Sequence, residues 1–207
     1  FESHSNHRYD TADYTRIDPL LGDETDFRAL AAAAKARGMR ILLDGVFSHT
    51  GSDSIYFNRE RRYPVDGAYN SPNSPYAEWY HFRSWPNDYG SWWGFPTLPE
   101  VEELSPAFME YINGAEGIVS RWLQAGADGW RLDVADELPD DVLSLIRKSS
   151  KEEKPDAVIL GEVWEDCVLK ESYGYRRNYA LGYSLDTVMN YPFRSHVLAF
   201  LHGYIDA

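Results

Sequence analysis

The chain has 207 residues, 43% hydrophobic and 26% charged, which is the composition of a globular protein rather than a disordered one. With 20 Lys and Arg against 33 Asp and Glu, its formal net charge is −13, which argues against nucleic acid and anionic membrane as partners and favours a neutral polar ligand. The single cysteine, Cys167, excludes an intrachain disulfide and a cysteine-based metal cluster.

Helical patterns and short apolar segments alternate along the chain. This alternation is typical of parallel βαβ units and predicts an α/β fold. In order, the pattern predicts a helix over 25–37 capped at Thr25 or Asp23, a strand over 39–47, a helix over 106–124, a strand over 129–135, a helix over 140–148, strands over 157–164 and 184–191, and a helix that begins at His196.

The connection that follows the first predicted strand, from about 48 to 106, is far longer than the usual βα loop of about 2 to 6 residues. We interpret it as a lid or an inserted subdomain. It contains many of the aromatic residues, including the stretch YAEWYHFRSWPNDYGSWWGFPTLP at 76–99. The aromatic rings of this connection have two possible roles, and one does not exclude the other. They can form an aromatic mini-core in a loop-rich unit, or they can line a cleft in which flat rings stack on flat ligands such as sugars.

Charged side chains interrupt the predicted strands close to their carboxyl ends, where the loops of a parallel α/β protein form a binding site. They are Asp44 in the first strand, Arg131 and Asp133 in the second, Glu162 in the third, and Asp186 with Asn190 in the fourth. Because these ends meet at one edge of the sheet, the sequence predicts a single shared site.

Asp133 and Glu162 form the central pair of this predicted site. Neighbouring strands lie about 4.8 Å apart, so the two carboxyl groups can approach the separation of about 5 to 5.5 Å found in retaining glycosidases. Arg131 shares a strand face with Asp133 and is expected to keep it ionised as a nucleophile, while Glu162 beside Val163 and Trp164 is expected to stay protonated as an acid. The alternatives are a buried Arg131–Asp133 ion pair without function and a solvated strand end at Glu162.

Two further residues are candidates for sugar contacts. His49 lies a few residues after the first strand and can donate a hydrogen bond to a hydroxyl, although a surface histidine in a loop is the alternative. Tyr9, in HRYDTADY, can stack on a sugar ring or simply pack in a loop.

Three short stretches, DGVFSHTG (44–51), GWRLDVADE (129–137) and GEVW (161–164), resemble signature regions of the α-amylase family, glycoside hydrolase family 13. The stretches FESHSNHRYDTADY, WWGFPTLP and LDTVMNYPF are similar to the cyclomaltodextrinase, neopullulanase and maltogenic amylase branch. The resemblance implies a partial (β/α)8 TIM barrel that holds its third to sixth strands. It divides the chain into a barrel segment at 1–49, an inserted subdomain at 50–106 and a barrel segment at 107–207.

The resemblance also implies roles for individual residues. Asp133 matches the nucleophile, Glu162 the general acid/base, and Arg131 the arginine that orients the nucleophile. The other matches are to substrate-binding positions: Tyr9, Asp44, His49, Glu137 near the acceptor side of the cleft, and Trp93 of WWGFPTLP. The implied partner is an α-glucan oligosaccharide such as a maltodextrin, a cyclodextrin or pullulan, cleaved at α-1,4 or α-1,6 bonds by double displacement.

Several features depart from the family pattern. The fourth signature region, with its transition-state-stabilising aspartate, is not among the 207 residues, so we expect a central fragment that is inactive by itself and forms homo-oligomers through its open sheet edges. No cofactor is implied, and Ser48 at a position usually held by a calcium-binding asparagine, with LPEVEE at 98–103, argues against structural calcium. Asp136 stands where the branch usually has asparagine.

Three other functions fit parts of the sequence. A non-catalytic amylase-like binding or interaction module has the same fold, but such relatives typically lose a catalytic carboxylate. A transglycosidase uses the same two carboxylates with a sugar as acceptor. An unrelated α/β barrel enzyme can use Asp, Glu and His side chains to hold a metal.

Overall fold

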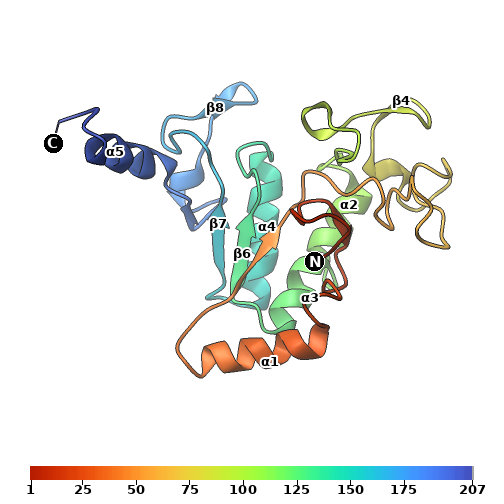
Figure 1. Cartoon of the computed structure of the whole chain (residues 1–207), viewed down its shortest axis with the longest axis horizontal. Coiled ribbons are helices and arrows are strands. Elements are labelled where there is room, and N and C mark those ends of the chain that lie inside the picture. The colour runs from red at the N-terminus through yellow and green to blue at the C-terminus, as the bar shows by residue number, and fades with distance from the viewer. Residues whose placement is uncertain (207) are drawn as a thin grey trace.

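The computed structural model describes residues 1–206 and places a four-stranded parallel sheet at the centre of this part of the chain (Figure 1). The strand order is β10–β7–β6–β3, and each neighbouring pair is parallel. These strands are Leu42–Gly45 (β3), Gly129–Leu132 (β6), Val158–Gly161 (β7) and Thr187–Val188 (β10). All four predicted strands therefore exist, although each is shorter than its apolar run, and the partial parallel barrel is confirmed.

Helices connect β3 to β6 and β6 to β7, as predicted, whereas the last helix begins at Tyr191, five residues before the predicted start at His196 and at the end of the predicted strand over 184–191. They are α1 (Glu24–Lys35), α2 (Pro106–Asn113), α3 (Ile118–Ala125), α4 (Asp140–Glu153) and α5 (Tyr191–Leu201). Of the two predicted caps for the first helix, Asp23 is the one used: its carboxylate accepts hydrogen bonds from the amides of Thr25 and Asp26 in a capping box.

The single helix predicted over 106–124 is wrong, because the structure divides it into α2 and α3. A turn separates them, in which the amide of Gly117 donates to the carbonyl of Gly114 at 2.8 Å. A Cβ atom at Gly117 would lie 2.7 Å from the carbonyl oxygen of Ile112, so a side chain there requires the backbone to shift. The apolar spacing continues across the break, which is why periodicity alone missed it.

Large aromatic side chains anchor the N-terminal segment to the barrel core. Trp122 of α3 and Trp130 of β6 are fully buried, and the ring of Phe1 packs against both, with centroid distances of 5.7 and 6.1 Å. The indole of Trp122 also donates to the carbonyl of Tyr14 at 2.8 Å. These contacts fix the segment that carries Tyr9.

The predicted inserted segment has little regular structure and packs around its own aromatic rings. Its elements are η1 (Ala77–Trp79), β4 (Phe82–Ser84), β5 (Asp88–Tyr89) and η2 (Trp92–Gly94). Phe57 lies 4.7 Å from Tyr89 and 4.9 Å from Tyr80 between ring centroids, and all three are buried. The mini-core interpretation is therefore right for these rings, whereas Trp93 is exposed.

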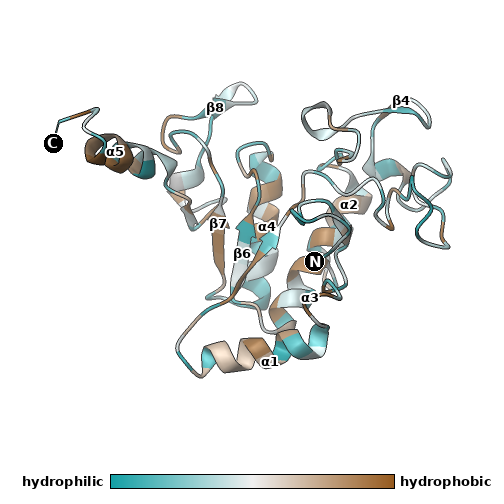
Figure 2. Cartoon of the chain, viewed as in Figure 1, coloured by the Kyte–Doolittle hydropathy of each residue, from teal (hydrophilic) through white to brown (hydrophobic). Residues whose placement is uncertain are grey.

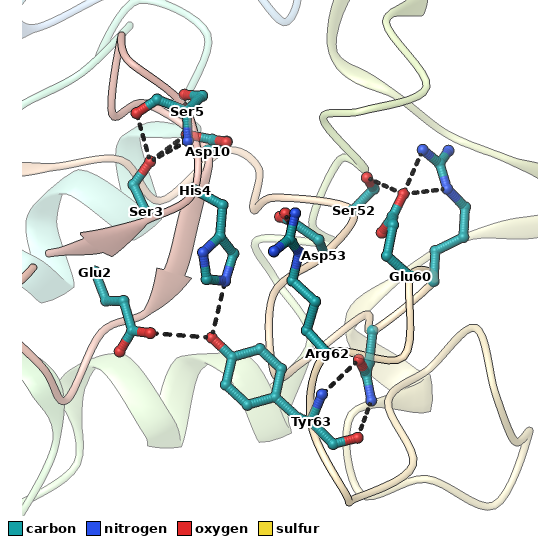
Figure 3. A network of polar contacts seen from close by, with 12 residues as sticks. Glu2, Ser3, His4, Ser5, Asp10, Ser52, Asp53, Glu60, Arg62 and Tyr63 are labelled. Carbon is teal, nitrogen blue, oxygen red and sulfur yellow. Dashed lines mark hydrogen bonds and ion pairs between the residues drawn. The ribbon is translucent and has the colours of Figure 1, made fainter.

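A polar network joins the N-terminal segment to the inserted segment (Figure 3). The N-terminal hairpin consists of β1 (Glu2–Ser3) and β2 (Thr11–Asp13), and its turn is closed by Asp10, whose Oδ1 accepts from the hydroxyl groups of Ser3 and Ser5. Across the interface, the hydroxyl of Tyr63 donates to Glu2 at 3.4 Å and lies 3.3 Å from Nε2 of His4. The loop that carries Tyr9 is thus held from two sides.

The C-terminal part of the described chain exposes apolar surface. It contains β8 (Glu171–Ser172), β9 (Tyr175–Arg176), η3 (Tyr179–Leu181) and α5, which projects away from the inserted segment. Figure 2 shows the strongly apolar α5, where Phe193, Phe200 and Leu201 are exposed. Within residues 1–206, no helix is long and apolar enough to cross a membrane.

Candidate active site

The parallel pairing of β6 with β7 brings Asp133 and Glu162 together. In the register, Leu132 lies opposite Gly161, so the next residue of each strand continues the pairing at the carboxyl end. The amide of Glu162 donates to the carbonyl of Leu132 at 2.9 Å, and the amide of Asp133 donates to the carbonyl of Gly45 at 3.0 Å. Backbone hydrogen bonds therefore place both carboxylates at one rim of the sheet.

The guanidinium of Arg131 contacts three carboxylates from three neighbouring strands. Nη1 lies 2.6 Å from Asp133 and 2.7 Å from Asp44, while Nη2 lies 2.9 Å from Glu162. Asp133 and Glu162 are both buried. Because one positive charge faces three acidic groups, the cluster is expected to retain a proton over part of the neutral range.

The pKa values of the carboxyl groups in this cluster shift in different directions. Burial raises the pKa of Asp133 to about 7, and Arg131 offsets this effect only in part. Partial burial also opposes ionisation of Glu162, but hydrogen bonds from the Trp164 side chain and the Val134 amide, with the charge of Arg131, outweigh it and lower the pKa of Glu162. These directions are the reverse of the expected order, in which Asp133 is ionised beside a protonated Glu162, and because the two carboxyl groups interact closely, the proton that they retain is shared by the pair.

A cavity of about 380 Å³ opens directly in front of this pair. Its walls combine the acidic cluster with aromatic rings, which is the mixture of polar and flat apolar groups that sugar-sized ligands require. The lining residues are His7, Tyr9, His49, Trp92, Leu98, Arg131, Asp133, Val134, Glu162 and Trp164. Tyr9, His49, Arg131, Asp133 and Glu162 were all predicted from the sequence to lie in one site.

Tyr9 and His49 lie on the same wall of the cavity. The Tyr9 ring lies 6.0 Å from the guanidinium carbon of Arg131. Burial lowers the pKa of His49 to about 4, so its ring is neutral at pH 7. One ring nitrogen of His49 contacts the carbonyl of Tyr9 and the other contacts the hydroxyl of Ser48, each at 3.0 Å. A hydrogen bond from His49 to a sugar therefore requires one of these contacts to break.

Glu137 and Trp93 lie beside the cavity instead of in its lining. The Glu137 carboxylate accepts hydrogen bonds from the indole N–H groups of Trp92 at 2.6 Å and Trp93 at 2.9 Å. Trp93 stacks on Trp92 with 5.2 Å between centroids and meets the edge of Trp164 at 5.7 Å. The three indoles form a continuous aromatic wall, which we call the tryptophan wall.

Sequence reasoning missed Trp92, Trp164 and Tyr191 as individual site residues. The hydroxyl of Tyr191 donates to Glu162 at 3.1 Å. The position of Trp164, two residues after Glu162 and therefore beyond the strand end, was a signal for a cavity residue. The position of Tyr191 at the start of α5 gave none.

The prediction that Asp186 belongs to the shared site is wrong. Asp186 precedes β10, and its carboxylate accepts from the amide of Ile159 near the start of β7, at 3.0 Å. Its other contacts are ion pairs with Arg147 at 3.1 Å and Lys151 at 2.8 Å, both from α4. Asp186 therefore stabilises the opposite end of the sheet. Asn190 is the N-cap of α5 and accepts from the amide of Phe193.

Among the residues that the structure describes, no group of three or more His, Cys, Asp or Glu side chains is arranged to hold a metal ion. The expectation that the protein uses no cofactor stays a prediction.

Comparison with known proteins places this geometry in a family. Residues 1–203 match the alpha amylase catalytic domain. The chain belongs to the alpha-amylase family. The catalytic domain of this family is a (β/α)8 barrel, and the four parallel strands form part of it.

Relatives of the chain are enzymes that act on α-glucans. The chain is 42% identical to the amylopullulanase of Thermoanaerobacterium saccharolyticum, over 98% of this chain and 17% of that protein. It is 36% identical to a cyclomaltodextrinase from a Bacillus species, over 100% of this chain and 35% of that protein. The chain thus spans about a third or less of these curated relatives.

A solved structure shares the fold over the whole chain. The cyclic α-maltosyl-(1→6)-maltose hydrolase of Arthrobacter globiformis, in complex with maltose, superimposes with a TM-score of 0.86 at 31% identity. The match covers 100% of this chain and 45% of that protein.

Proposed function

We propose that the chain is the central part of a retaining α-glucan hydrolase that cleaves α-1,4 or α-1,6 bonds in maltodextrins, cyclodextrins or pullulan. The observation that carries this proposal is the contact of one guanidinium, that of Arg131, with both Asp133 and Glu162 at the floor of a cavity with aromatic walls. Two carboxylates that line the same sugar-sized cavity match the requirement of double displacement for a pair of carboxyl groups that flank the cleaved bond.

In the proposed reaction, Asp133 attacks the anomeric carbon while Glu162 gives its proton to the glycosidic oxygen. The C–O bond to the leaving sugar breaks, and a covalent ester forms between the glycosyl group and Asp133. Glu162, now ionised, takes a proton from water, and the resulting hydroxyl displaces Asp133. A second sugar in place of water gives transglycosylation with the same proton movements.

Arg131 has two proposed roles in this sequence. Its contact with Asp133 stabilises the carboxylate that attacks and leaves again. Its second contact, with Glu162, keeps the acid/base carboxyl within reach of the same sugar. A forked guanidinium can hold both groups at once, which a lysine ammonium cannot do with the same geometry.

Covalent labelling tests the nucleophile directly. We expect a fluorinated maltosyl fluoride, whose ester intermediate turns over slowly, to attach to the longer protein that contains this chain. Peptide mapping by mass spectrometry is expected to locate the adduct on Asp133. An adduct on Glu162 or on another residue would contradict the assignment, and protein pretreated with a competing maltodextrin serves as the control.

The rival of a non-catalytic binding module makes a different prediction in the same experiment. A protein that only binds sugars forms no covalent adduct. Its affinity for maltodextrin is therefore the same before and after treatment with the fluorinated maltosyl fluoride. The burial of both carboxylates next to an arginine favours the catalytic proposal, because burying charged groups for structure alone is a poor source of stability.

We further propose that the isolated 207-residue chain is an open half of a barrel that is inactive and associates with itself. In the described residues, β3 and β10 end the sheet, each with one side unpaired. The apolar residues of α5, among them Phe193, Phe200 and Leu201, are exposed. Unpaired strand edges beside exposed apolar surface favour association with a second copy.

Sedimentation velocity on the isolated chain is the measurement for this proposal. We expect a dimer or larger species that leaves added maltodextrin intact. A monomer with a single cooperative thermal transition would contradict self-association, and release of reducing sugar would contradict the proposed inactivity.

A further inference from the structure

The loop that follows β7 holds the loop that carries the candidate nucleophile. Three successive backbone carbonyls in the loop after β6 each accept a hydrogen bond from it. Arg177 Nη1 donates to the carbonyl of Asp136 at 3.0 Å, and Arg177 Nη2 donates to the carbonyl of Leu138. The hydroxyl of Tyr173 donates to the carbonyl of Glu137, which lies between them in the sequence. This pattern fixes the path of the backbone between Asp133 and α4.

Arg177 is unusual among the arginines of the chain because its side chain has 0% exposure. Its Nε donates to Asp140, the first residue of α4, at 2.7 Å, and Nη1 also donates to the hydroxyl of Ser172 at 2.7 Å. The guanidinium lies 4.7 Å from the ring centroid of Tyr179 and 5.3 Å from that of Tyr173. A guanidinium is costly to bury, so one that donates four hydrogen bonds in a buried position indicates a loop held in one conformation.

The loop that Arg177 holds also carries Glu137. The carboxylate of Glu137 accepts hydrogen bonds from the indole N–H groups of Trp92 and Trp93. Trp93 has a positive φ of 49°, which costs energy for a residue with a side chain and persists only where the surroundings enforce it. The hydrogen bond to Glu137 is such a constraint. A continuous set of contacts therefore leads from Arg177 to the tryptophan wall.

The tryptophan wall lies on the Glu162 side of the cavity, because Trp164 follows Glu162 by two residues and lines the cavity. In double displacement, the acid/base carboxyl protonates the leaving sugar and later deprotonates the acceptor, so the acceptor enters on the side of this carboxyl. Flat indole rings on that side are suited to hold a sugar in preference to water.

We propose that Arg177, together with Tyr173, is a positioning residue that sets the choice between water and a sugar as acceptor. This inference rests on the proposed function. Arg177 acts through the carbonyls of residues 136 and 138 and through Glu137, which hold Trp92 and Trp93 in place. Loosening the loop is expected to weaken acceptor sugar binding more than it weakens attack by Asp133 on a small activated substrate.

The test is Arg177→Lys in the longer protein, with maltosyl fluoride as donor and maltose as acceptor. We expect the ratio of transfer to hydrolysis to fall by about tenfold, because lysine cannot donate to both carbonyls and to Asp140 with the same geometry. Tryptophan emission is expected to shift to the red as the wall loosens. The matched control is Arg176→Lys, since Arg176 is exposed and its side chain makes one hydrogen bond, to the carbonyl of Val168.

Tyr173→Phe provides an independent variant that removes one hydrogen bond from an exposed side chain, so it tests the inference even if Arg177→Lys does not fold. We expect it to lower the same ratio by roughly threefold. Unchanged ratios and emission in Tyr173→Phe, and in Arg177→Lys if folded, would overturn the positioning role. Asp133→Asn is measured in parallel. Undiminished turnover of this variant would show that the proposed function fails, which is a different outcome from failure of the positioning role.

Discussion

Replacing Asp133 with Asn in the longer protein is expected to lower kcat on maltodextrin by at least about 10⁴-fold, since an amide cannot form the ester intermediate. The measurement is release of reducing sugar at saturating substrate. The matched control is Asp136→Asn, three residues further along the same loop, which gives the residue that the branch usually carries. We expect this control to keep activity within a few-fold. Turnover of Asp133→Asn equal to that of the unaltered protein would refute the nucleophile assignment.

The same substitution has an expected effect on stability that distinguishes lost chemistry from lost folding. Burial raises the pKa of Asp133 to about 7, above its value in the unfolded chain. The folded protein therefore loses stability as the pH rises from the pKa of the unfolded chain to about 7, because the unfolded chain releases this proton first. An uncharged Asn avoids the cost. The melting temperature of Asp133→Asn is therefore expected to equal or exceed that of the unaltered protein at pH 8. A large decrease would indicate that lost activity reflects unfolding.

Much of the fold could be predicted because the strands of a parallel sheet carry short apolar runs, which leave a strong signal in the sequence. The apolar runs around residues 42–45, 129–132 and 158–161 correspond to strands β3, β6 and β7. Charges at the strand ends then located Arg131, Asp133 and Glu162 in one site. Strand ends are less visible in sequence, so Asp186 was placed at the wrong end of the fourth strand.

Other parts of the site could not be predicted because they depend on contacts between distant segments. Glu137 is separated by 44 and 45 residues from the two indole groups that it binds, and no local pattern connects them. The order of the two carboxyl pKa values likewise depends on Tyr191 and on the Val134 amide, as well as on burial. Reasoning from neighbours in the sequence, such as Val163, could not include these contacts.

The order of the pKa values leads to a prediction about pH. Between the lowered pKa of Glu162 and the pKa of about 7 at Asp133, the pair holds one proton. The proposed reaction needs that proton on Glu162 and an ionised Asp133, which is one of the two arrangements of this singly protonated state. Activity is therefore expected to fall as the pH rises above about 7, when the pair loses its proton.

Glu162→Gln removes the acid/base group and with it the alkaline limb of this pH profile. On maltodextrin we expect kcat to fall by about 10² to 10⁴-fold. On maltosyl fluoride, whose leaving group needs little protonation, formation of the ester is expected to be nearly unaffected. Without the negative charge of Glu162, the pKa of Asp133 is expected to fall. The residual activity should then rise with pH and level off, with no decrease above pH 7.

The control for this experiment is Glu165→Gln, since Glu165 is exposed, follows Glu162 by three residues and pairs with Lys170 at 2.9 Å. This variant is expected to keep the decrease in activity above about pH 7. If Glu162→Gln retained the alkaline limb near pH 7, the titrating group would be a different residue. If formation of the ester from maltosyl fluoride fell as much as kcat on maltodextrin, Glu162 would act in placing the substrate, because loss of a proton donor alone affects this step according to the basicity of the leaving group.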